Sequence, residues 1–181
     1  MTLEPDQPFA FSAPAAIDRD HLVASLFVRE GAALVGMARL FTDDRNAAED
    51  LVQEAFIRLY RSAHRIHDLD KAAPYLRSIV LNLARDHNRR GLMSLRHQEE
   101  RVLVMSPEAP EDHLLLDEQQ ARILEGLRSL SVRQRDCLVL RFYLDLSERQ
   151  IAETLGISPN SVKTHCRRGL AALRTMLEVA P

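Results

Sequence analysis

The sequence predicts an all-α protein, with two small helical domains joined by a flexible acidic linker and a helix-turn-helix in the C-terminal domain. Apolar residues recur at the three- and four-residue spacing of amphipathic helices, and no run alternates at period two for long enough to form a convincing strand. The longest loss of periodicity covers residues 92–113, where Pro107 and Pro110 stand among acidic residues. A length of 181 residues suits one ordinary domain or two small ones. We expect a disordered tail at 1–16, domains at 17–92 and 117–181, and the linker at 93–116.

Three helices are expected in the first domain. The first begins near Asp18 and continues to Phe41. Asn46 and Glu49 have the spacing of a capping box, which would begin the second helix. Pro74 suits the first turn of the third helix, and the sequence Arg89-Arg90-Gly91 resembles a helix stop. The expected apolar faces comprise Leu22, Leu26, Phe27, Leu34, Val35, Ala38 and Phe41, then Leu51, Val52, Ala55, Phe56, Leu59 and Tyr60, then Leu76, Ile79, Val80 and Leu83.

The second domain contains the strongest local motif. Ser147 with Gln150 forms another capping-box pattern, and Gly156 permits the left-handed turn that ends a short helix at Leu155. Ser158-Pro159 then caps and begins a second helix. This arrangement predicts a helix-turn-helix, whose second helix enters the major groove of DNA. Its expected buried stripe is Val162, Cys166, Leu170, Leu173 and Leu177.

The outward face of that second helix carries the chemistry of DNA recognition. Hydroxyl, amide and cationic groups bond base edges and phosphates, and no acidic residue occurs between Ser158 and Arg168. The other interpretation is an ordinary helical hairpin with a solvated polar face. The candidate DNA-binding residues are Ser158, Asn160, Ser161, Lys163, Thr164, Arg167 and Arg168.

Charge divides the chain into blocks. The overall net charge of −2 argues against a nucleic-acid binder, but residues 1–70 and 97–120 are acidic while 71–96 and 121–181 are basic. In the first domain Asp50, Gln53 and Glu54 share the polar side of a helix. The helix from Pro74 to Arg90 is basic, and its candidate contacts with nucleic acid are Tyr75, Arg77, Asn82, Arg85, Asn88 and Arg89. The alternative for the acidic surface is an ordinary solvated helix face. The alternative for the basic helix is that its arginines only complement the helix dipole near the C-terminal end.

Three segments resemble extracytoplasmic-function (ECF) sigma factors. Ala48–Phe56 resembles the helix that binds core RNA polymerase, and Tyr75–Asp86 resembles the helix that melts the promoter and reads its minus-ten element. Leu130–Leu173 resembles the domain that reads the minus-thirty-five element. The three segments follow the family's order, with an acidic linker between the domains. Family members often carry Trp where this chain has Tyr75.

The resemblance implies a role for each surface. Asp50, Gln53 and Glu54 would bind core polymerase, the basic helix would hold the minus-ten strand, and the 64–71 loop would accept an unstacked base. The helix-turn-helix would bind the minus-thirty-five duplex. The implied protein is a cytoplasmic initiation factor whose partners are core polymerase, promoter DNA and an anti-sigma factor.

Other classes are disfavoured by what the sequence lacks. We expect no enzymatic activity, cofactor, metal site, small-molecule substrate or membrane span, because no catalytic, phosphate-binding or zinc-ligand pattern occurs and no uninterrupted apolar run approaches 18 residues. Cys137 and Cys166 cannot form a disulfide framework, which suits a reducing compartment. One alternative is a LuxR-type regulator that binds an operator without polymerase. Another is a helical adaptor or an anti-sigma partner.

Overall fold

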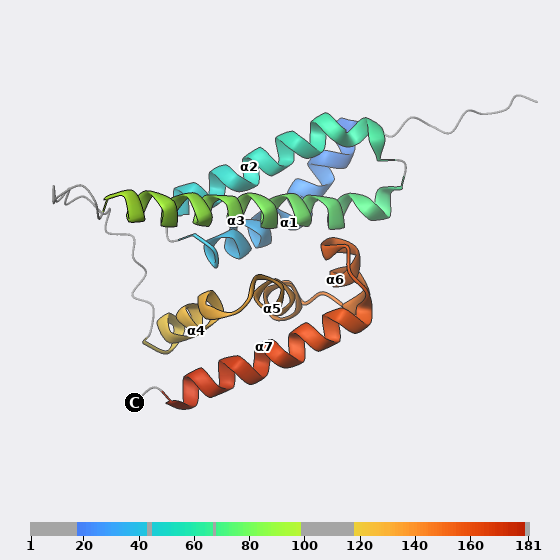
Figure 1. The fold of residues 1–181 in the computed structure, drawn as a ribbon. Helices are drawn as coiled ribbons and strands as arrows, with labels where there is room; N and C mark the ends of the chain where they lie inside the picture. Colours follow the sequence, from blue (N-terminus) through green and yellow to red (C-terminus); the bar gives the residue numbers. More distant parts are fainter. Residues whose placement is uncertain (1–17, 43–44, 67, 99–117, 180–181) are drawn as a thin grey trace, which may run out of the picture.

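The structure is a computed structural model that describes residues 18–42, 45–66, 68–98 and 118–179. Within these ranges every regular element is helical, which confirms the all-α prediction (Figure 1). The expected tail at 1–16 and residues 99–116 of the expected linker lie outside the described residues, whereas 93–98 belong to a helix. Two groups of helices, one from each end of the chain, pack against each other.

The N-terminal domain consists of three long helices and two short turns. The helices are α1 (Arg19–Arg39), α2 (Arg45–Ser62) and α3 (Ala72–Gln98), and the turns between α2 and α3 are η1 (Ala63–Arg65) and η2 (Leu69–Lys71). Asp18 caps α1 by accepting hydrogen bonds from two backbone amides. The expected face of α3 is buried in full, since Leu76, Ile79, Val80 and Leu83 all belong to the core.

Helix α1 is the one described helix long and apolar enough to pass a length-and-composition test for a membrane span. Its position in the fold accounts for that composition. Leu26, Leu34 and Met37 are almost fully enclosed against α2 and α3 and form a core face. Phe27 and Val28 are exposed, at 58% and 86%, so the expectation that Phe27 lies on the buried face is wrong. Helix α1 is not a membrane span.

Two expected helix boundaries in this domain are wrong. Helix α2 begins at Arg45, so Asn46 lies inside the helix and is not its cap. Helix α3 continues to Gln98 instead of stopping at Arg89-Arg90-Gly91. A glycine inside a helix costs only about 1 kcal/mol relative to alanine, and the leucine, methionine and arginine residues that follow Gly91 are good helix formers.

The C-terminal domain contains α4 (Glu118–Ser129), α5 (Val132–Leu138), α6 (Glu148–Leu155) and α7 (Pro159–Val179). Between α5 and α6 lies η3 (Val139–Tyr143), a π-helical segment. Helix α7 crosses α5 at Gly169, where a Cβ atom would come within 2.9 Å of Leu138. The buried face of α7 therefore differs in part from the prediction. Val162 is buried as expected, whereas Leu170 and Leu177 are exposed.

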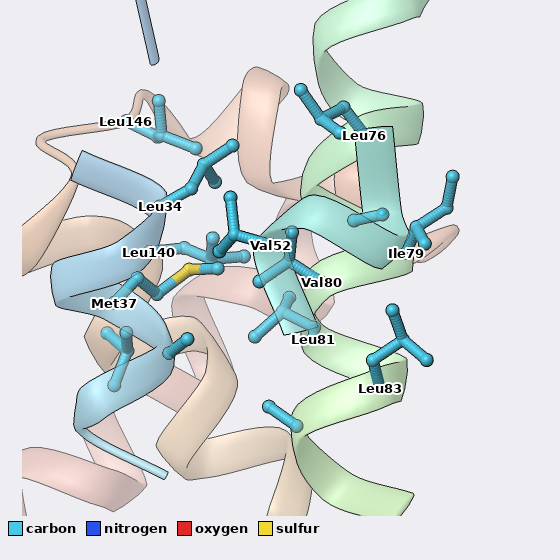
Figure 2. Packing of buried hydrophobic residues seen from close by; sticks show 14 of the residues in the cluster. Leu34, Met37, Val52, Leu76, Ile79, Val80, Leu81, Leu83, Leu140 and Leu146 are labelled. Atoms are coloured by element: carbon cyan, nitrogen blue, oxygen red, sulfur yellow. The ribbon is translucent and has the colours of Figure 1, made fainter. Parts of the chain in front are cut away.

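The two domains share one apolar core. Leu140 and Leu146, from the C-terminal domain, belong to the same buried cluster as Leu34, Met37 and Val80 of the N-terminal domain (Figure 2). Helix α3 packs against α6, and its Arg85 side chain reaches Asp136 of α5. The basic helix of the first domain therefore faces the helix-turn-helix domain.

Candidate nucleic-acid interface

The helix-turn-helix has the predicted local geometry. Ser147 and Gln150 make both hydrogen bonds of a capping box at the start of α6. Gly156 ends α6 with φ 63°, in the left-handed region, and the Ile157 amide donates to the Ala152 carbonyl at 3.1 Å. The Ser158 hydroxyl then accepts a hydrogen bond from the Ser161 amide at 3.1 Å, which caps α7. The capping box fixes the start of α6, and the Gly156, Ile157 and Ser158 features fix the turn between α6 and α7.

The predicted outer face of α7 is largely open to solvent. Ser161 and Thr164 are half-buried, and the Thr164 hydroxyl donates to the Asn160 carbonyl at 3.0 Å. The face thus presents a row of amide and cationic groups to solvent. Some of its hydroxyls already make hydrogen bonds to the backbone of the same helix. The exposed members are Ser158, Asn160, Lys163, Arg167 and Arg168.

One acidic side chain lies beside this face, although the sequence of α7 gives no sign of it. Glu148, at the start of α6, places its carboxylate 3.6 Å from the Lys163 ammonium. Both side chains are substantially exposed, so this ion pair is weak and easily exchanged for another anion. Lys163 is therefore paired but accessible.

Arg77 on α3 has a different environment from its predicted companions. Its side chain is 10% exposed and its guanidinium donates two hydrogen bonds to Glu30 of α1, from Nε at 2.9 Å and from Nη2 at 2.7 Å. A bidentate pair of this kind satisfies both groups and ties α3 to α1. In this conformation Arg77 acts inside the domain and does not face a nucleic acid.

The remaining candidates on α3 follow one side of the helix. Asn82 and Arg89 are exposed, and Arg85 and Asn88 are half-buried. The Arg85 guanidinium donates to the Asn82 side chain at 2.9 Å and also pairs with Asp136 of the C-terminal domain. Arg89 lies 3.5 Å from Asp86, with both side chains exposed.

A cavity of about 450 Å³ lies between the end of α2 and the start of α3. Tyr75, which is 42% exposed, and Lys71 are on its wall, together with Ser62, Arg65, Ile66 and Asp68. Asp68 accepts a hydrogen bond from the Asp70 amide at 3.0 Å, which shapes the η2 turn. The cavity combines an aromatic ring, an aliphatic wall and cations, which suits a stacked base with its phosphate.

The polar face of α2 includes residues that sequence reasoning missed. Asp50 and Gln53 are exposed, and Glu54 is bound by Arg58 at 2.7 Å. Ile57 and Tyr60 are also exposed, at 45% and 46%, although Tyr60 was expected in the core. The spacing Gln53, Ile57, Tyr60 follows one helix face and could have indicated this apolar extension.

Two protein-family models match the chain, one in each domain. The model described as Sigma-70 region 2 matches residues 26–91, and the model described as Sigma-70, region 4 matches residues 120–173. The RNA polymerase sigma-E factor of Streptomyces coelicolor is 33% identical over 146 residues, which cover 80% of each chain. The ECF RNA polymerase sigma factor SigX of Bacillus subtilis is 30% identical over 146 residues, covering 75% of this chain and 73% of the relative.

Solved structures share the fold. The structure of CnrH in complex with the cytosolic domain of CnrY superimposes with a TM-score of 0.68 at 24% identity, covering 92% of this chain and 94% of the other. The sigma factor RpoE of Bartonella quintana, in complex with the anti-sigma factor NepR, gives 0.64 at 20% identity, covering 87% and 98%. With both sigma regions matched in order, each on its own helical domain, the chain belongs to the ECF family of RNA polymerase sigma factors.

Proposed function

We propose that this sigma factor binds core RNA polymerase through α2, captures the minus-ten strand through α3 and its adjacent loop, and reads the minus-thirty-five duplex through α7. The observation that carries the proposal is the succession of two different DNA-type surfaces along one chain. A cavity of about 450 Å³ with an aromatic wall, beside a basic helix, is followed by an exposed recognition helix. A LuxR-type regulator needs only the second surface, and residues 26–91 match sigma region 2 instead of a sensory domain.

The assignment of α7 to duplex DNA depends on its open, cationic outer face. Arg167 and Arg168 lie one turn beyond Lys163, where they can follow a phosphate backbone, and Asn160 lies at the N-terminal end that enters the groove. The capped turn before Pro159 makes this end of the helix rigid. We therefore assign base contacts to the first two turns and phosphate contacts to the arginines.

The assignment of α3 to single-stranded DNA depends on the Tyr75 cavity and the cations beyond it. A base that leaves the duplex loses stacking worth about 1.4 kcal/mol per step, and stacking on an aromatic ring restores about 1–3 kcal/mol. Lys71 lies on the cavity wall, and Arg85 and Arg89 continue along α3. The strand would run from the cavity along α3, with its phosphates on these arginines.

The assignment of α2 to core polymerase rests on a mixed surface. Asp50 and Gln53 are polar, while Ile57 and Tyr60 form an exposed apolar extension one and two turns later. Apolar centres with polar rims are typical of protein interfaces. We also expect the chain to work in the cytoplasm, where polymerase is found, and to be held by an anti-sigma factor until needed.

Transcription by purified core polymerase with this protein, with start sites mapped across genomic DNA, tests the proposal. We expect starts that share two upstream elements, and failure to bind core polymerase in a pull-down would refute it. The same experiment identifies both promoter elements.

A pair of substitutions tests the α2 surface. Glu54→Arg should weaken core binding and leave minus-thirty-five DNA binding unchanged. Glu54→Arg combined with Arg58→Glu rebuilds the Glu54–Arg58 ion pair in reverse. If the double variant regains full core binding, Glu54 only stabilises the helix and its assignment to the interface is wrong.

A further inference from the structure

The strand-binding face of α3 is partly occupied by the chain itself. Arg85, which we assign to a DNA phosphate, is bound by Asp136 of α5 through Nη2. The Asp136 side chain has no solvent exposure, whereas that of Arg85 retains 24%. The C-terminal domain therefore presents a carboxylate where the promoter would present a phosphate.

Two further contacts hold the domains in this arrangement. The Arg135 guanidinium lies over the Phe41 ring at 5.0 Å, a cation–π contact between α5 and the segment after α1. The Tyr143 side chain of η3 packs directly on the α1 backbone at Gly36. Any Cβ at position 36 would overlap the Tyr143 hydroxyl and lie 2.9 Å from the ring carbon Cζ.

The space left between α3 and the C-terminal domain is small and is lined by charged side chains. A cavity of about 380 Å³ lies between Asn82 and Arg85 of α3 and the turn around Gly156. A neighbouring cavity of about 420 Å³ contains Tyr75. Glu153 of α6 lines both cavities, and it is paired at 3.1 Å with Arg149, which lines the second, while Arg133 of α5 lines the first. The proposed path of the strand is therefore narrowed by charged side chains of both signs from the C-terminal domain.

We propose that in the free chain the C-terminal domain closes over α3 and inhibits it, with the Asp136 carboxylate occupying Arg85 in place of a DNA phosphate. This inference rests on the proposed function, because it takes α3 as the strand-binding helix. The outer face of α7 stays exposed in the closed form. Closure therefore blocks the minus-ten contact and leaves duplex reading available.

The closed form is built to be released. Oδ1 of Asp136 and Nε of Arg85 are buried without hydrogen-bond partners among the described residues. Such groups are normally satisfied in a permanent core. Burial also raises the pKa of the Asp136 carboxyl despite the opposing effect of Arg85, so the buried environment disfavours the ionised form. Separation of the domains rehydrates both groups.

Small-angle X-ray scattering and strand binding by the full-length protein test the inference. Gly36→Leu places a side chain in the space of Tyr143 and lies outside every surface assigned to DNA or polymerase. Gly31→Ala is its control on the same helix, because a Cβ there meets only Phe27, at an ordinary 3.7 Å. Arg85→Glu places a carboxylate against that of Asp136 and should also open the molecule. Only its radius of gyration is measured, because Arg85 is itself assigned to the DNA strand. The binding probe is a short fluorescein-labelled single strand of mixed sequence.

We expect the wild type and Gly31→Ala to be compact, and both Gly36→Leu and Arg85→Glu to show a larger radius of gyration. Gly36→Leu should bind the strand about tenfold more tightly if the closed form holds nine-tenths of the molecules, since apparent affinity scales with the open fraction. An extended wild type, unchanged radii in both opening variants, or an opened Gly36→Leu with wild-type strand affinity would each overturn the inference. Any of these outcomes together with promoter-specific transcription by the wild type leaves the proposed function standing. A compact, inhibited chain that supports no transcription refutes the function instead.

Discussion

Removing Arg77 should destabilise the N-terminal domain far more than removing Arg89, an exposed arginine of the same helix. The Arg77 and Glu30 side chains are 10% and 14% exposed and share two short hydrogen bonds. Breaking a buried pair by deleting one partner costs about 3–5 kcal/mol. Glu30 can still turn toward Arg29, whose guanidinium lies 3.7 Å away, so we expect about 3 kcal/mol for Arg77→Ala.

Urea denaturation followed by circular dichroism measures this loss, with Arg89→Ala as the matched control. Arg89 is 74% exposed and its pair with Asp86 is a surface one, so its removal should cost less than about 1 kcal/mol. A double-mutant cycle with Glu30→Gln should give a coupling energy of about 1.5–3 kcal/mol. A loss below about 1 kcal/mol with no coupling would show that Arg77 is free for DNA and that its structural role is wrong.

Three other outcomes follow from single residues. Because burial raises the pKa of Asp136, its contribution to stability is present at acid pH and is lost as the pH rises through that pKa. The urea midpoint of the wild type should therefore fall relative to that of Asp136→Asn as the pH rises above about 4, and parallel curves would contradict this. Gly156→Ala should lower the free energy of unfolding by about 1 kcal/mol, because alanine is strained at φ 63°. Gly31→Ala inside α1 should raise it by up to about 1 kcal/mol, and equal effects of the two substitutions in thermal unfolding would show that the left-handed turn does not require glycine. Arg167→Ala should lower the slope of log affinity against log salt for minus-thirty-five duplex by about one, in a fluorescence titration; an unchanged slope would remove Arg167 from the phosphate contacts.

Local rules predicted the helix-turn-helix well because its determinants are adjacent in sequence. The Ser147 and Ser158 caps and the Gly156 turn depend on residues within a few positions of one another, and all three are confirmed. The Asn46 cap failed because α2 already begins at Arg45, and the sequence offers other polar residues of capping type at 42–44. Capping patterns identify a helix start more reliably where one candidate stands alone.

Contacts between distant segments could not be predicted in this way. The partners Arg77–Glu30 and Arg85–Asp136 are 47 and 51 residues apart, and both arginines had been grouped with the exposed residues of a basic helix. Periodicity likewise placed Leu170 in the core, because it could not detect that α7 crosses α5 at Gly169. Side-chain spacing specifies a face, but the neighbouring elements decide what covers it.

The ion pairs made by the proposed DNA-binding cations alter how promoter affinity will respond to salt. A cation that binds a phosphate normally releases a counterion from DNA. Arg85 and Lys163 must first leave Asp136 and Glu148, and each freed carboxylate then gathers a cation from solution. The net ion release is therefore smaller than the number of phosphates contacted. Salt titrations of this sigma factor will undercount its phosphate contacts, and its affinity for promoter DNA will fall less steeply with ionic strength than that of a protein with unpaired cations.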